Sequence, residues 1–116
     1  CQIQVLNKTG AVISFGKLLV KDPSNGCFAY RVATDDEYSK VEAISAEYIN
    51  NGEIGNAILI NKALFNYVYF TSKGIGVGQL YTVSENGSII ETDDKNKAIF
   101  LNIDGETLKF VCVCAP

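Results

Sequence analysis

The chain has 116 residues, the size of one typical domain, and its 47% hydrophobic and 20% charged content is that of a globular rather than a disordered protein. The net charge is −3 and the ten basic residues are scattered, so nucleic acid and anionic membranes are not expected partners. No apolar run approaches the ~18 residues of a membrane span. The chain has no histidine, which removes the usual general base and the commonest metal ligand.

Short apolar runs rich in β-branched and aromatic residues, broken by Gly, Asn, Asp and Pro, predict β-strands along the first half. A turn of helix or a loop is expected after residue 33, because Thr34 or Asp35 can cap it and Glu37 stands three residues after Thr34. The predicted strand segments are residues 2–6, 11–15, 17–21, 27–33, about 41–48, and 57–60.

The second half shows the same alternation of apolar runs and turns. Asn86-Gly87 and Asp104-Gly105 are strong signals for tight hairpin turns, since both favour a left-handed backbone. The predicted strands are residues 66–71, 80–83, 88–91, 98–103 and 107–114. The sequence therefore predicts an all-β chain.

Similar residue groups recur in the same order in both halves, which indicates an internal repeat. In order, 16–19 (GKLL) match 78–81 (GQLY), Asn25-Gly26 matches Asn86-Gly87, 34–36 (TDD) match 92–94 (TDD), Lys40-Val41 matches Lys97-Ala98, and 51–53 (NGE) match 104–106 (DGE). The alternative is chance repetition of common turn dipeptides. One such unit has too few strands to bury a face alone. We predict one domain over residues 1–116, a small β-sandwich or β-barrel built from two tandem repeated β units at about 2–62 and 66–114.

The four cysteines, Cys1, Cys27, Cys112 and Cys114, match no zinc-site spacing. Cys112 and Cys114 stand two apart on an apolar predicted strand, so they project from one face and cannot easily bond each other. Buried thiols are the favoured interpretation, a disulfide from one of these two to Cys27 or Cys1 is the alternative, and redox or metal chemistry comes third. We expect no metal and no cofactor.

No group of residues commits the chain to a reaction. A Ser, Thr or Cys nucleophile needs an adjacent base, and no histidine is available. The acidic runs at 35–37 and 93–94 are interpreted as solvated turns rather than a calcium site, and the glycines of 74–78 lack phosphate-loop spacing. We predict that the chain is not an enzyme.

The run at residues 16–22 (GKLLVKD), followed by Asn25-Gly26 and by an apolar strand after Gly52-Glu53, resembles the head-decoration and head-fibre β domains of tailed bacteriophages. The resemblance implies a non-enzymatic virion protein that trimerises or sits on a capsid lattice. Its partners would be further copies of itself and other structural proteins.

Two alternatives place the chain outside the cell or on its surface. In a filament subunit, a strand formed by Gln2, Ile3, Gln4, Val5 and Leu6 would add to the sheet edge of a neighbour. In a carbohydrate-binding module, Tyr67 and Tyr69 would form the partner or glycan surface. An N-terminal cysteine is also the residue that carries lipid in a bacterial lipoprotein, which leaves Cys1 open to that interpretation.

Overall fold

The computed structural model describes residues 2–60, 69–71, 78–102 and 107–109. Within these ranges the regular elements are ten strands and two single turns of 3-10 helix, which confirms the all-β class. The strands are β1 Gln2–Asn7, β2 Leu18–Lys21, β3 Ala29–Val32, β4 Ala43–Ser45, β5 Ile54–Leu59, β6 Tyr69–Thr71, β7 Leu80–Val83, β8 Ile89–Thr92, β9 Phe100–Asn102 and β10 Thr107–Lys109, and the turns are η1 Pro23–Asn25 and η2 Asp35–Glu37.

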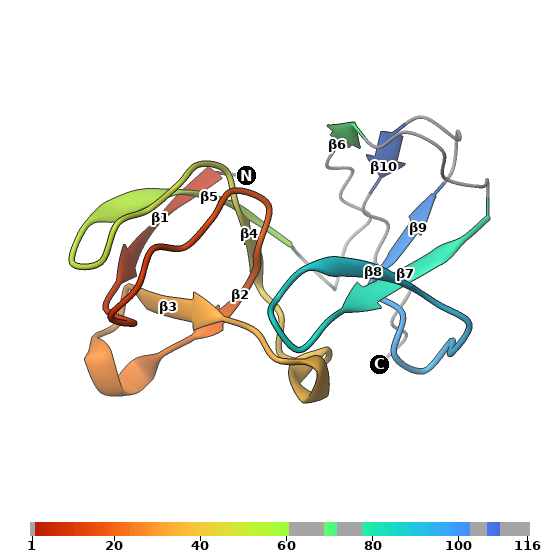
Figure 1. Cartoon of the computed structure of the whole chain (residues 1–116), viewed down its shortest axis with the longest axis horizontal. Coiled ribbons are helices and arrows are strands. Elements are labelled where there is room, and N and C mark those ends of the chain that lie inside the picture. The colour runs from red at the N-terminus through yellow and green to blue at the C-terminus, as the bar shows by residue number, and fades with distance from the viewer. Residues whose placement is uncertain (1, 61–68, 72–77, 103–106, 110–116) are drawn as a thin grey trace.

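Strands β1 to β5 form a closed barrel in the order β1-β3-β2-β4-β5 (Figure 1). Every neighbouring pair is antiparallel except β1 and β3, which run parallel over two residue pairs, Leu6 with Ala29 and Asn7 with Tyr30. In contrast, β1 pairs with β5 along five residues, from Gln2 opposite Ile58 to Leu6 opposite Ile54. Of the two predicted architectures, the first half therefore adopts the barrel.

Side chains that alternate along the strands fill the barrel interior. The interior cluster consists of Val5, Ile13, Leu19, Tyr30, Ala43, Ile49 and Ala57. Two buried polar side chains, Asn7 and Ser45, are hydrogen-bonded there: Asn7 Nδ2 donates to the carbonyl oxygens of Ala11 (2.7 Å) and Ile49 (2.8 Å), and Ser45 Oγ donates to that of Ser14 (2.7 Å). These bonds hold the long β1–β2 connection against the barrel.

That connection corrects one prediction. Residues 11–15 do not form a strand, because Ile13 makes only an isolated antiparallel bridge with Ile49. The backbone groups around it bond to Asn7 and Ser45 side chains instead of to a neighbouring strand. The strand expected at 41–48 is also shorter, and spans only Ala43–Ser45. The helical turn before it forms as η2, with the predicted capping box between Thr34 and Glu37.

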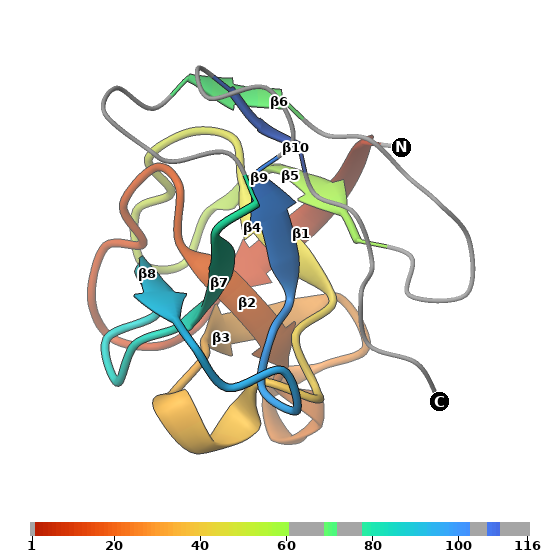
Figure 2. The same cartoon turned by 90° about the vertical axis from the view of Figure 1, so that its right-hand side faces the viewer.

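The second sheet is antiparallel, in the order β6-β10-β9-β7-β8. It lies on the right of Figure 1, and Figure 2 shows β7 and β9 in front of the barrel strands β2 and β4. The two sheets share a second buried cluster. Its barrel members are Leu18, Val20, Ala33, Val41, Ile44 and Ile60, and its second-sheet members are Tyr81, Val83, Ile99 and Phe100.

The two halves have the same strand order. In the barrel the neighbouring strands follow in the order β1, β5, β4, β2, β3, and in the second sheet in the order β6, β10, β9, β7, β8. Each half thus arranges its first, fifth, fourth, second and third strands in the same way. The second and fourth strands of each half also pair in the same register, since Leu18 of β2 lies opposite Ile44 of β4 and Leu80 of β7 lies opposite Leu101 of β9. Gly16 and Gly78, two residues before β2 and β7, have φ of 82° and 85°. The two halves differ in closure: β1 pairs with β3, whereas no β6–β8 pair occurs among the described residues.

The β7–β8 turn touches the barrel wall at Gly87. The backbone N–H of Leu18 donates to the Gly87 carbonyl oxygen at 2.8 Å. A Cβ on Gly87 would lie 2.1 Å from Val32 Cγ1, and its φ of 78° already favours glycine. Close backbone approach therefore explains why glycine stands here.

We predict that Gly87→Ala destabilises the protein by about 3 kcal/mol or more, because it combines left-handed strain with overpacking between the sheets. Gly52→Ala is the matched control, since Gly52 has a similar φ of 83° but no atom within 4 Å of the added Cβ. It should cost only about 1–2 kcal/mol. Urea unfolding followed by tyrosine fluorescence measures both, and equal losses would contradict the close-contact explanation.

Candidate functional site

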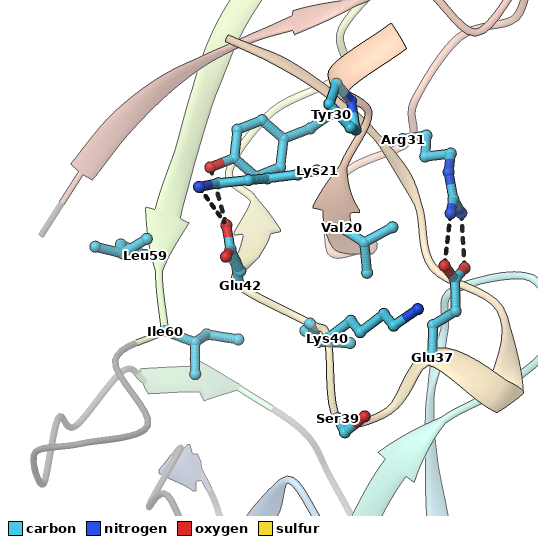
Figure 3. A pocket seen from close by; sticks show the side chains of 12 residues that line it. Val20, Lys21, Tyr30, Arg31, Glu37, Ser39, Lys40, Glu42, Leu59 and Ile60 are labelled. Carbon is cyan, nitrogen blue, oxygen red and sulfur yellow. Dashed lines mark hydrogen bonds and ion pairs between the residues drawn. The ribbon is translucent and has the colours of Figure 1, made fainter. Parts of the chain in front are cut away.

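A pocket with a volume of about 870 Å³ lies beside β2 and β3 (Figure 3). Figure 3 shows Arg31 and Glu37 facing each other on one side, and Lys21, Tyr30 and Glu42 on the other. Strands β2 and β3 supply Lys21, Tyr30 and Arg31, and the η2 turn supplies Glu37. Of these residues, only Glu37 has a local contact that the sequence predicts, the capping box with Thr34.

Arg31 and Glu37 form a two-bond ion pair at one side of the pocket. Arg31 Nη1 and Nη2 donate to the two Glu37 oxygens at 2.6 and 2.5 Å. Glu37 Oε1 also accepts from the backbone N–H of Thr34 (3.1 Å) and its hydroxyl (3.0 Å). The Arg31 hydrogen bonds lower the pKa of Glu37 to about 2, and the same bonds raise the pKa of Arg31. The pair joins η2 to β3.

The other side of the pocket is more loosely held. Tyr30 donates its hydroxyl to Glu42 at 3.3 Å, and Lys21 Nζ lies 3.8 Å from the same carboxylate. Burial raises the pKa of Tyr30, and the Glu42 charge raises it further, so this hydroxyl stays protonated. The pocket thus presents two ion pairs, a neutral phenol and the further cation of Lys40.

The acidic runs are placed largely as the sequence predicted. Asp35 and Asp36 are exposed on η2, and Asp93 and Asp94 are exposed on the turn after β8. Glu37 is the exception, because it turns toward Arg31. In the described part of the chain, no group of three or more Cys, Asp or Glu side chains is placed to hold a metal ion.

The predicted cysteine and tyrosine sites are only partly visible. Cys27 is exposed and free on the turn before β3, so neither a buried thiol nor a disulfide describes it here. Cys112, Cys114 and Tyr67 lie outside the described residues, and Tyr69 is placed only as the first residue of β6. The glycan-surface prediction therefore stays a prediction.

The predicted assembly strand, Gln2 to Leu6, forms most of β1. One of its edges is fully paired with β5, whereas its other edge meets β3 only at Leu6 and Asn7. A groove of about 510 Å³ lies beside the remaining edge and is lined in part by Ile3, Cys27, Phe28 and Ile54. Phe28 is 69% exposed and Ile54 is 64% exposed, which is unusual for large apolar side chains so close together.

Sequence reasoning missed Phe28 and Ile54 as surface residues. Phe28 falls inside the predicted strand at 27–33, and Ile54 follows a turn, so both have the pattern of core residues. Only the three-dimensional pairing of β1 with β3 and β5 brings them to one groove.

The fold is similar to that of the head fiber gp8.5 N base in bacteriophage phi29, known from a crystal structure. The TM-score is 0.65 and the sequence identity 14%, over 96% of this chain and 92% of that chain. The resemblance predicted from the sequence is thus confirmed at the level of the fold. No protein-family model matches the sequence, and no curated protein matches it. No helix within the described ranges has the length and apolarity needed to cross a bilayer.

We predict that acid weakens the fold through Glu37. Its folded pKa of about 2 lies below the ordinary 4.5, so the ionised form stabilises the protein above the unfolded pKa and this contribution is lost between about pH 5 and pH 2. Glu37→Gln should lower the free energy of unfolding at pH 7 by about 1 kcal/mol, a modest value because the Arg31 side chain is 40% exposed. Its stability should then change less than that of the wild type across this interval.

Asp36→Asn is the control, since Asp36 lies on the same turn and is exposed. Urea unfolding at a series of pH values measures all three proteins. An Asp36→Asn curve that also flattens, or a Glu37→Gln curve that keeps the full acid loss, would contradict the assignment.

Proposed function

We propose that this chain is a non-enzymatic structural component of a tailed-phage virion, located on the capsid and acting through protein–protein assembly. The observation that carries the proposal is the fold likeness to a head fibre base, which spans nearly the full length of both chains. The name of that protein places it at the base of a head fibre, and we propose the same position for this chain.

The surface supports a role in assembly more than one in catalysis. The described pocket has two ion pairs within it, Arg31 with Glu37 and Lys21 with Glu42, and leaves Lys40 as a further cation. Large apolar side chains, by contrast, stand exposed at several places on the barrel, among them Val12, Phe28, Tyr48 and Ile54. Exposed apolar groups of this size are typical of protein contact surfaces.

We also propose that the two halves are tandem repeats of one β unit. The shared strand order, the shared register of Leu18 and Leu80, and the similar φ of Gly16 and Gly78 support it. The boundary between the units, predicted near residues 62–66, stays a prediction because residues 61–68 lie outside the described ranges. A duplicated chain would carry two related scaffolds in a fixed orientation, each with its own outer surface.

The proposal predicts that the protein is part of the assembled particle. The full chain with a small C-terminal tag would be expressed during phage infection of the source host, and particles would be purified on a density gradient. We expect the tagged chain to comigrate with DNA-filled heads in a constant number of copies per head. An unrelated tagged β protein of similar size serves as the control and should stay at the top of the gradient.

Two other outcomes would replace the proposal. Open-ended polymers of the isolated chain, with none in the heads, would favour the filament subunit, for which the partly unpaired edge of β1 is the supporting feature. A monomer that stays off the heads but binds glycans would favour the carbohydrate-binding module.

A further inference from the structure

We infer that two copies of this chain pair antiparallel through the free edge of β1, with Ile3 of each copy on the two-fold axis. The inference rests on the proposed function, in which the chain acts by self-assembly, and it names one contact that such assembly would use. Three features support it: the hydrogen-bonding groups left on β1, the apolar groove beside them, and the lack of charge in both.

The first feature is the direction in which the β1 backbone groups point. The N–H of Leu6 donates to the carbonyl oxygen of Phe28 at 2.9 Å, so Leu6 directs its backbone toward β3. Backbone groups alternate sides along a strand, which means that Gln4 and Gln2 point the same way. The β3 pairing begins only at Leu6, and no described residue pairs with Gln2 or Gln4 on that side.

The second feature is the groove that flanks this edge. Its lining includes Ile3 and Gln4 from β1, Phe28 from the turn before β3, and Ile54 at the start of β5. Gln2 and Gln4 are exposed, while Ile3 is half-buried against the barrel interior cluster. A strand added here would find hydrogen-bonding partners on β1 and would cover apolar surface at the same time.

The third feature identifies the added strand as a second copy of β1. In a dimer with a two-fold axis, a residue near the axis lies close to its own copy. A charged residue there therefore tends to meet a like charge. The segment from Gln2 to Leu6 carries no charge, and neither does any residue that lines the groove. A partner selected by charge would have no complementary group to meet.

The geometry also fixes the register. On this edge, Gln2 and Gln4 are the β1 residues whose backbone groups have no partner among the described residues, and an antiparallel pair satisfies both copies when Gln2 of one lies opposite Gln4 of the other. This register forms four backbone hydrogen bonds. It places Ile3 opposite Ile3 in a non-hydrogen-bonded pair, where Cα atoms are about 4.5 Å apart. Two half-buried isoleucines would then close the centre of the contact.

Charge pairs on β1 provide the test. In the double variant Gln2→Lys/Gln4→Lys, two lysine pairs face each other across the axis, and we expect the dimer dissociation constant to rise at least tenfold. In Gln2→Glu/Gln4→Lys, each glutamate faces a lysine, and the constant should stay near or below that of the wild type. Both residues are exposed, so neither variant should affect folding. Sedimentation equilibrium of the full chain over a range of concentrations measures all three.

A cross-link tests the position of the axis. With Cys27→Ser as background, Ile3→Cys should give a covalent dimer on mild oxidation, because Cα atoms about 4.5 Å apart suit a disulfide. Val12→Cys in the same background is the control, since Val12 is 52% exposed on another part of the barrel, and it should give little dimer beyond the background.

The outcomes separate this inference from the proposed function. A monomeric wild type, equal dissociation constants for the two charge variants, or no excess cross-link at Ile3 over Val12 would overturn β1 pairing. Comigration with phage heads would then still support the virion role. A β1 dimer that never comigrates with heads would instead overturn the virion role and leave the pairing intact.

Discussion

The structure depends on β2 being buried on both faces. Leu19 points into the barrel interior, while Leu18 and Val20 point outward into the cluster shared with the second sheet, and all three are at most 2% exposed. Burying each such side chain is worth about 1.5–3 kcal/mol, more than an exposed ion pair contributes. The barrel wall therefore serves as the foundation of the second sheet, and the close approach of Gly87 to Leu18 and Val32 follows from that packing.

Side-chain size accounts for why the first half closes, whereas the described strands of the second half do not. A five-stranded barrel has a narrow interior, and the buried Ala43 and Ala57 keep it small. In the second sheet, the position corresponding to Ala43 by register is Phe100, and that corresponding to Leu19 is Tyr81. These larger rings contact the outer wall of the barrel instead of a closing pair of strands. The same strand order thus gives two shapes.

Local features of the fold were predictable from the sequence, and features that join distant segments were not. The Thr34–Glu37 capping box and the strand at residues 80–83 depend on neighbouring residues, so short-range patterns revealed them. The parallel pairing of Leu6 with Ala29 joins segments more than twenty residues apart and has no local signature. The candidate sites follow the same division. Gln2 to Leu6 stood out as a strand of alternating polar and apolar residues, whereas Arg31 with Glu37, and Phe28 with Ile54, meet only after the barrel has closed.

Barrel closure also decides which strand edge is left for assembly. Closing a sheet normally removes its edges, and the edges that remain are commonly protected by charge. Here β1 is six residues long and meets β3 only from Leu6 onward, so closure is incomplete along its first half. The end strand β8 carries the exposed Glu91, whose charge discourages strand addition, whereas the segment Gln2 to Leu6 of β1 carries only uncharged residues. Of these two edges, β1 is therefore the one that the fold leaves open to another strand.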